Sequence, residues 1–236
     1  MGGPEGTEKL RLLSAMDIFA ESPEAVATVD RLAPMVTAQR GDLLSDPSRR
    51  GAGVHFIKRG HVRLYALDPD GHEATVAVLG QGHVFGEVGA LAASPPQLYA
   101  EAMDEVALCT LRSGDLEELL RQEPRLGLRL LEALSGRIRN LEEQLVALAL
   151  RDVRHRLLLL LARLAAAFGD PSGGWASIDF ITHQEIATMI GSTRETVTAT
   201  LSDLARSGAV RTGRRQMWVN SAIVARLLDE TGGDAH

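Results

Sequence analysis

Arg194-Glu195, an arginine followed directly by a glutamate, is the pair of residues in this chain with the most specific chemistry. An arginine can donate two hydrogen bonds to O6 and N7 of guanine, and a glutamate can accept one from the amino group of cytosine. Each such contact discriminates against the wrong base by about 1–3 kcal/mol. Arg194 and Glu195 are therefore candidate base-contacting residues, if the fold projects them into the major groove of double-stranded DNA.

Two short helices joined by a tight turn are expected to present this pair. Thr182 can cap the first helix while Glu185 reaches back to it, and the stretch from Ser192 to Glu195 repeats this capping-box spacing before the second helix. Gly191 lies between them and permits the sharp turn of a helix-turn-helix. The apolar residues that would pack the helices together are Ile186, Ala187, Ile190, Val197, Leu201 and Leu204. The side chains left facing outward are Arg194, Glu195, Thr198 and Ala199.

Further polar residues near this motif are suited to contacts with the DNA backbone. Hydroxyls, amides and backbone N–H groups at helix starts commonly meet phosphates. The candidates near the two helix starts are Thr182, Gln184, Thr193 and Thr196. Residues 208–219 are interpreted as a hairpin wing that carries Arg214 and Arg215 at its tip, against the DNA backbone.

A seam of apolar residues at spacings of four and three precedes this module and predicts a long helix that pairs with its twin. The seam residues, and hence the expected dimer interface, are Leu134, Ile138, Leu141, Leu145 and Leu148. The flanking charged residues leave a narrow stripe, which favours a partner helix over the alternative of a helix packed only on its own domain. Asp152 is an expected N-cap for a new helix over 153–168, with Gly169 at its C′ position. A hinge is therefore expected near residues 150–152.

Between residues 36 and 111 the pattern is that of short strands separated by turns. Asp68-Pro69-Asp70-Gly71 has the residues of a hairpin turn, because proline presets φ and glycine accepts a positive φ. The sequence thus predicts an α+β chain with an N-terminal antiparallel, jelly-roll-like β-roll, a long dimerisation helix and a C-terminal winged helix-turn-helix. The expected divisions are a disordered stretch over 1–8, the roll over 9–123, the dimerisation helix over 124–151 and the DNA-binding domain over 152–236.

Composition limits the other classes of function. The net charge is −6, but residues 151–236 carry 10 arginines against 9 acidic residues, so the acidity lies in the preceding part of the chain. The single cysteine, Cys109, excludes an intramolecular disulfide and a cysteine-only iron–sulfur site, and is expected to be a small core residue. No apolar run is long enough to span a membrane, and no secretory signal is evident, so a cytoplasmic protein without a membrane partner is expected. Metal-ligand spacings, nucleophile–base arrangements and phosphate-binding loops are not found, so neither a metal site nor an enzyme is expected.

The order of these elements resembles the CRP/FNR family of bacterial transcription regulators over residues 10–228. The matching motifs are Phe56 to Tyr65, Gly80 to Glu87, and Ile181 to Val197. The resemblance implies a homodimer with a cyclic-nucleotide-binding-like sensor roll, and two recognition helices that read a two-fold-symmetric operator in the major groove. It also implies RNA polymerase as a partner. Many members carry a further arginine at the position of Ala199, so this chain is expected to prefer somewhat different bases near the edge of each half-site.

One departure from the family concerns the effector. Members that bind cyclic AMP follow Gly-Glu, here Gly86-Glu87, with an Arg-Ser pair, and this chain has Gln97-Leu98 at that position. The cyclic phosphate would lose its counter-charge, and charge-assisted hydrogen bonds are roughly twice as strong as neutral ones. Hydroxyl residues that face the adenine in those members are replaced here as well. The candidate effector pocket comprises Gly86, Glu87, Gln97, Leu98, Leu141 and Glu142.

The sequence therefore favours a regulator that requires neither cyclic AMP nor another cofactor. An alternative is an effector-gated regulator whose roll binds a cyclic nucleotide or another small ligand, or haem. Haem is disfavoured because lone histidines on strands and turns are usually structural; those of the roll are His55, His61, His72 and His83. A further alternative is a ligand-binding regulatory module without a DNA function, against which the complete module at 182–219 argues.

Overall fold

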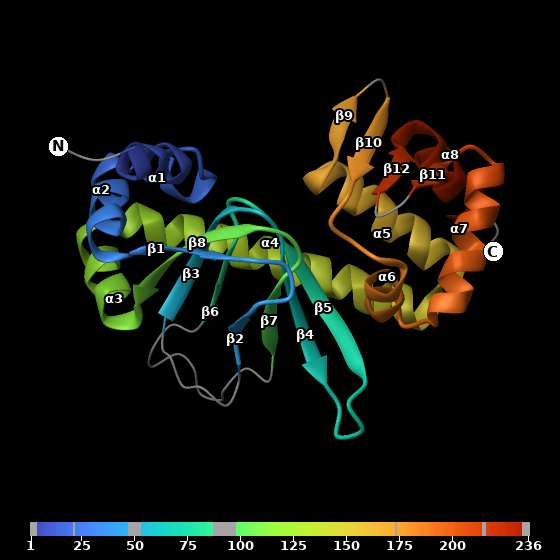
Figure 1. Cartoon of the computed structure of the whole chain (residues 1–236), viewed down its shortest axis with the longest axis horizontal. Helices are drawn as coiled ribbons and strands as arrows, with labels where there is room; N and C mark the ends of the chain where they lie inside the picture. Colours follow the sequence, from blue (N-terminus) through green and yellow to red (C-terminus); the bar gives the residue numbers. More distant parts are fainter. Residues whose placement is uncertain are drawn as a thin grey trace. The chain divides into compact units, whose positions relative to one another are not determined.

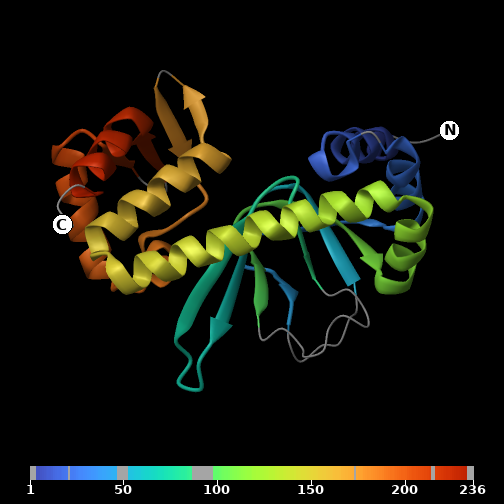
Figure 2. The same cartoon turned by 180° about the vertical axis from the view of Figure 1, so that it is seen from behind.

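The computed structural model describes residues 4–20, 22–46, 53–86, 98–172, 174–213 and 216–232 (Figure 1). The chain divides into two compact units, residues 1–139 and residues 140–236. The division falls within helix α4 (Pro124–Leu150), which Figure 2 shows as one unbroken helix. Each unit is described separately below.

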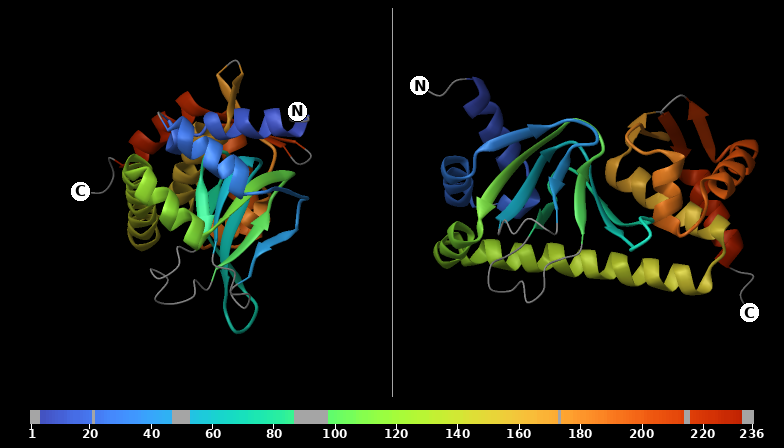
Figure 3. Two further views of the ribbon diagram at one scale, coloured as in Figure 1. Left: turned by 90° about the vertical axis from the view of Figure 1, so that its left-hand side faces the viewer. Right: turned by 60° about the horizontal axis from the view of Figure 1, so that its bottom comes forward.

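The first unit is built on two four-stranded antiparallel sheets. The right-hand view of Figure 3 shows how their strands lie beside α4. One sheet has the order β1-β8-β3-β6 and the other β2-β7-β4-β5. Their strands are β1 (Met35–Ala38), β2 (Leu43–Ser45), β3 (Gly53–Arg59), β4 (Val62–Leu67), β5 (Glu73–Leu79), β6 (Val84–Gly86), β7 (Tyr99–Ala102) and β8 (Val106–Arg112). One apolar core, which includes Ile57, Leu64 and Ala100, draws residues from both sheets. The predicted antiparallel roll is confirmed.

Helices cover the other face of the β3–β8 pair. They are α1 (Pro4–Ser14), the short 3₁₀ helix η1 (Asp17–Phe19), α2 (Pro23–Leu32), α3 (Ser113–Gln122) and the start of α4. The second core joins them to Phe56 and to Cys109, which is fully buried as expected. The expectation of disorder over residues 1–8 is corrected for residues 4–8, which form the start of α1. Proline is tolerated in the first turn of a helix, and Leu13, fully buried in the core, anchors α1.

A buried lysine attaches α1 to the roll. Lys58 is completely buried at an irregularity in the pairing of β3 with β8, and its Nζ donates to the carbonyl oxygen of Lys9 at 3.2 Å. Burial lowers the pKa of Lys58, because removal from water penalises the charged ammonium. No sequence pattern indicates this contact, since lysine is rarely fully buried.

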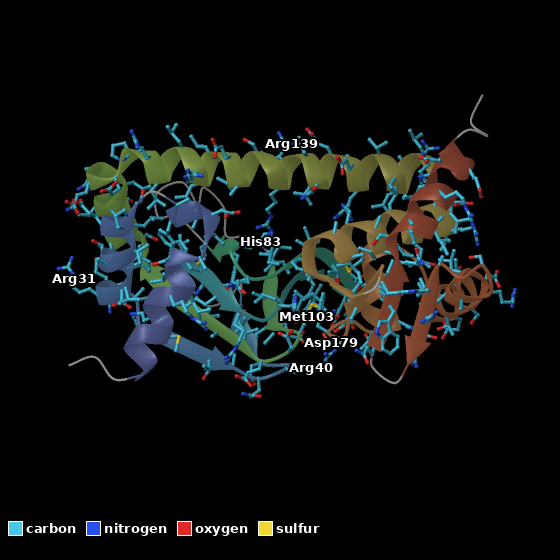
Figure 4. The ribbon with its side chains drawn as sticks, turned by 90° about the horizontal axis from the view of Figure 1, so that it is seen from above. Arg31, Arg40, His83, Met103, Arg139 and Asp179 are labelled. Carbon is cyan, nitrogen blue, oxygen red and sulfur yellow. The ribbon has the colours of Figure 1, made fainter. Side chains whose placement is uncertain are left out.

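The turns of the roll are held by backbone and side-chain hydrogen bonds. Arg40, labelled in Figure 4, donates from Nη1 to the carbonyl oxygen of Met103 at 2.6 Å. The predicted hairpin between β4 and β5 is confirmed: Gly71 has a φ of 85°, and the N–H of Asp68 donates to the carbonyl of His72 at 3.0 Å. The Asp68 carboxylate also accepts from the backbone N–H of Asp70 at 2.9 Å, which fixes the turn further.

Two glycines of the roll provide a matched test of backbone strain and crowding. Gly60 and Gly71 have φ values of 83° and 85°, but a Cβ at Gly60 would overlap the carbonyl oxygen of Glu105, whereas a Cβ at Gly71 would meet no atom within 4 Å. Gly71→Ala is expected to lower the free energy of unfolding by about 1–2 kcal/mol through strain alone. Gly60→Ala should cost about 1–3 kcal/mol more through overpacking. Urea unfolding of both variants measures the difference, and equal losses would refute this account.

The second unit contains, besides residues 140–150 of α4, helix α5 (Val153–Phe168) and a four-stranded antiparallel sheet in the order β11-β12-β10-β9. Its remaining elements are β9 (Asp170–Ser172), β10 (Trp175–Ile178), α6 (His183–Ile190), α7 (Arg194–Arg206), β11 (Val210–Gly213), β12 (Gln216–Asn220) and α8 (Ser221–Gly232). The β9–β10 hairpin was not expected from the sequence. Because Pro171 lies in the middle of β9, this stretch has the composition of a loop.

The predicted N-cap of α5 is confirmed, but the predicted position of its terminal glycine is not. Asp152 is the N-cap as predicted, and its carboxylate accepts from the N–H of His155 at 2.7 Å. Gly169, expected at the C′ position, is instead the C-cap, and its backbone is extended, with a φ of −72° and a ψ of 141°. Glycine is needed there for a different reason: a Cβ would overlap Ala176 on β10. Close packing of α5 against the sheet therefore accounts for this residue.

Candidate DNA-binding surface

The first helix of the predicted helix-turn-helix is α6, and its ends are as expected. The Thr182 hydroxyl oxygen accepts from the N–H of Glu185 at 3.2 Å, while the Glu185 carboxylate accepts from the N–H of Thr182, which completes the capping box. Gly191 ends the helix in the left-handed conformation, with φ 60° and ψ 55°. Glycine adopts this conformation without a Cβ penalty, so the chain can turn sharply into α7.

The N-cap of α7 lies one residue later than the sequence predicted. Thr193, not Ser192, is the N-cap, and its hydroxyl oxygen accepts from the N–H of Thr196 at 3.2 Å. Ser192 belongs to the preceding turn, because its N–H donates to the carbonyl of Ala187 at 3.0 Å. As a consequence, Arg194 and Glu195 are the first two residues of the helix.

The outward face of α7 carries the predicted base-contacting residues. Val197, Leu201 and Leu204 are buried and fix the rotation of the helix against the rest of the unit. Residues Arg194, Glu195, Thr198 and Ala199 are exposed. Within the described ranges, neither Arg194 nor Glu195 forms a salt bridge that would hold it against the protein. Both side chains can therefore reach a groove.

The four predicted phosphate-contacting residues at the helix starts are all exposed. The hydroxyls of Thr182 and Thr193 also serve as helix caps. The Thr182 oxygen accepts a backbone N–H and keeps its own proton available for a phosphate. The hydroxyls of Thr193 and Thr196 lie 2.9 Å apart, so one donates to the other and one proton stays available.

The predicted hairpin after α7 is present as β11 and β12, which pair from Val210 opposite Val219 to Gly213 opposite Gln216. Arg214 and Arg215, the residues expected at its tip, lie outside the described residues. Arg211 lies over the ring of Trp175, with Cζ 4.1 Å from the ring centre. This cation–π contact ties the hairpin to β10, and the sequence did not reveal it.

One residue of this surface was missed by sequence reasoning. The Nδ1 atom of His183, the first residue of α6, lies 3.0 Å from the hydroxyl oxygen of Thr198 on the outward face of α7. Burial lowers the pKa of His183, and the nearby positive charge of Arg194 lowers it further. A histidine after a helix cap carries no signal of such a contact, because the contact depends on the angle between two helices.

The residues of the candidate effector pocket fall in both units and in a stretch that the structure does not describe. Gly86 ends β6 with a φ of 115°, and a Cβ there would overlap the carbonyl oxygen of Gly53, so strand packing already requires a glycine. Leu98 is half-buried in the same unit, whereas Leu141 and Glu142 are exposed on the part of α4 that belongs to the second unit. Glu87 and Gln97 lie outside the described residues.

The histidines of the roll have protein partners. His55 Nδ1 lies 2.8 Å from the hydroxyl of Thr110, and its ring stacks on Phe85. The other ring contacts join His61 to Asp104, His72 to Asp68, and His83 to the carbonyl of Gly80. Burial lowers the pKa of His55. These contacts agree with a structural role for the four side chains.

The apolar seam of α4 is exposed. Its residues Leu134, Ile138, Leu141, Leu145 and Leu148 are 37–67% exposed. Leu128 and Leu131, nearer the start of the helix, are exposed as well. A contiguous apolar stripe on a helix surface is typical of an interaction site.

Known proteins resemble both halves of the chain. Residues 35–123 match the cyclic nucleotide-binding domain, and residues 155–222 match the Crp-like helix-turn-helix domain. The global nitrogen regulator of Nostoc sp. is 34% identical over 181 residues, which cover 75% of this chain and 80% of that protein. The cyclic AMP receptor protein of Thermus thermophilus is 31% identical over 180 residues, 76% of this chain and 79% of that one. The structure of FixK2 from Bradyrhizobium japonicum shares the fold, with a TM-score of 0.73 and 23% identity over 83% of this chain and 97% of its own. In the part of the chain described, no helix is long and apolar enough to cross a membrane.

Proposed function

This chain belongs to the CRP/FNR family of DNA-binding transcription regulators, and we propose that it reads a two-fold-symmetric operator as a homodimer. The observation that carries this proposal is the exposed pair Arg194-Glu195 in the first turn of α7. In a helix-turn-helix the N-terminal residues of the second helix contact base edges in the major groove. Arg194 would donate to a guanine and Glu195 would accept from a cytosine.

Contacts with the phosphates of the DNA backbone would set the register of this helix on the duplex. We assign them to the hydroxyl and amide groups at the starts of α6 and α7, and to Arg214 and Arg215 of the hairpin. Such contacts supply affinity without sequence preference, because every base pair carries the same phosphates. We also propose that the protein acts in the cytoplasm and contacts RNA polymerase, since the chain belongs to a family of transcription regulators.

The homodimer is supported by the exposed seam of α4. Two copies of this helix could bury the seam against each other, which would place two α7 helices on the two halves of one operator. The alternative of a helix packed only on its own domain is disfavoured, because the seam residues are exposed in the single chain.

For the sensor roll, we propose that DNA binding does not require cyclic AMP. The support is Gln97-Leu98, which supplies no positive charge for a cyclic phosphate. A second candidate is an effector-gated regulator. It is favoured by the match of residues 35–123 to the cyclic nucleotide-binding domain and by the similarity to a protein named as a cyclic AMP receptor.

Binding assays with purified protein separate these two candidates. An operator is first selected from a random DNA pool, with and without a panel of cyclic nucleotides. The protein is expected to bind the selected duplex with no additive, and to lose affinity steeply as salt rises, because phosphate contacts release counterions. Band shifts that appear only with cyclic AMP would contradict the proposal and support the gated regulator.

A further inference from the structure

His183 occupies a place on the DNA-binding surface that the base and backbone contacts above do not use. It is the first residue of α6, between the exposed residues Thr182 and Gln184, and it is half-buried. Its imidazole contacts Thr198 on the outward face of α7, one helical turn after Arg194. The ring therefore lies where α6 and α7 both approach the proposed position of the DNA.

The hydrogen bonds of Thr198 determine which ring nitrogen carries a proton. The Thr198 hydroxyl donates its single proton to the carbonyl oxygen of Arg194 at 2.8 Å. The Thr198 oxygen can therefore only accept from His183, so Nδ1 of the ring is the protonated nitrogen. In the neutral ring, Nε2 is then an acceptor with no proton to donate. A phosphate oxygen is also an acceptor, so the neutral ring cannot bond to it.

We infer that His183 contacts a DNA phosphate and takes up one proton at Nε2 from solvent when DNA binds. This inference rests on the proposed DNA-binding function. The protonated imidazole donates from both nitrogens, from Nδ1 to Thr198 as before and from Nε2 to the phosphate. Thr198 acts as a positioning residue, because it holds the ring in the form that must be protonated to serve as a second donor.

The surrounding charges set the direction of the pH dependence. In the free protein, burial and then the charge of Arg194 lower the pKa of His183, which favours the neutral ring. On its own helix the carboxylate of Glu185 is bonded to the N–H of Thr182. The other ionisable residues of the two helices packed against α6 are Glu195, Asp203 and Arg206 on α7, and Arg154, His155, Arg156 and Arg163 on α5. A bound phosphate adds a negative charge and raises the pKa of His183. DNA binding therefore takes up protons at pH values between the pKa of His183 in the free protein and its pKa in the complex.

The test is the affinity of the full chain for its selected operator between pH 5.5 and 8.5 at constant ionic strength, followed by fluorescence anisotropy. Uptake of one proton changes an affinity by at most about tenfold per pH unit. We expect the wild type to bind about tenfold more weakly at pH 8 than at pH 6. His183→Gln should abolish most of this slope, because the amide does not titrate but can still donate a hydrogen bond.

Two variants of Thr198 separate proton linkage from simple packing. Thr198→Ser keeps the hydroxyl and should keep the wild-type slope. Thr198→Val removes it and lets the neutral ring carry its proton on Nε2, so the slope should diminish while binding at pH 8 improves relative to binding at pH 6. NMR titration of the His183 ring should show a higher pKa with DNA than without it.

The outcomes distinguish this inference from the function on which it rests. DNA binding with a wild-type slope in His183→Gln, a flat profile in the wild type, or a pKa of His183 that DNA does not raise would each overturn the inference and leave the DNA-binding function intact. Failure of the wild type to bind the selected DNA at every pH would instead contradict the proposed function, and the inference with it.

Discussion

A double variant with Ile138→Glu and Leu145→Glu will be monomeric and will bind the operator at least about a hundredfold more weakly than the wild type. In the dimer, the seam of each chain would place two carboxylates in the apolar contact with the seam of the other chain. Burying unpaired charges costs several kcal/mol. Linking two half-site contacts in one particle typically raises overall affinity by about 10²–10⁴, and separated chains lose that gain. Sedimentation velocity measures the mass, and titration of the operator measures the affinity.

The matched control is Asn140→Glu, on the same helix but away from the seam. Asn140 is exposed, so the new carboxylate stays in water and should leave both mass and affinity unchanged. A double variant that remained dimeric and bound the operator normally would show that the exposed stripe is not the dimer interface. Circular dichroism of both variants checks that the helix content is unaltered.

Arg194→Ala is expected to weaken binding to the preferred site by about 1–3 kcal/mol and to flatten the preference at one base pair of each half-site. The loss is specific because the arginine is assigned to the edge of a guanine and not to a phosphate. Selection of bound DNA from a random pool, repeated with the variant, measures both the affinity and the base preference.

Arg215→Ala provides the contrast, since a phosphate contact contributes equally to all sequences. We expect it to weaken every sequence by a similar factor and to reduce the salt dependence. If Arg194→Ala left the selectivity profile unchanged, its role in base recognition would be refuted.

The helix-turn-helix could be predicted from the sequence because its signals are local. A capping box needs residues three positions apart, and the left-handed turn needs a glycine, so Thr182, Glu185 and Gly191 were assigned correctly. Ser192 and Thr193 both have side chains that can cap a helix. The choice between them depends on which N–H group already donates within the preceding turn, and that is known only from the folded structure.

Contacts between residues that are far apart in the sequence could not be predicted from sequence patterns. The bond between His183 and Thr198 depends on how α6 and α7 pack, and the attachment of α1 by Lys58 depends on the irregular pairing of β3 with β8. Gly169 was expected at C′ because glycine commonly ends helices, but it is the C-cap, and a Cβ there would overlap Ala176. The residues predicted to form the effector pocket belong to both units. Whether they lie together cannot be derived from local sequence patterns.

The final turns of α4 have a consequence for how this chain can be divided or recombined. With its amide oriented so that the oxygen faces Arg163, the Gln144 side chain accepts from Nη2 and Nη1 of that residue at 3.0 and 3.2 Å. Leu148 lies so near Gly191, at the turn between α6 and α7, that a Cβ there would be 3.2 Å from its Cδ2 atom. A fragment that begins at residue 152 would therefore lose contacts that hold both α5 and this turn. A natural or designed exchange of DNA-reading halves between relatives should be tolerated better in mid-helix near residue 140, if the four-and-three spacing of the seam is kept in phase. We therefore expect the smallest exchangeable part that reads DNA to begin inside α4 and not at the bend that follows this helix.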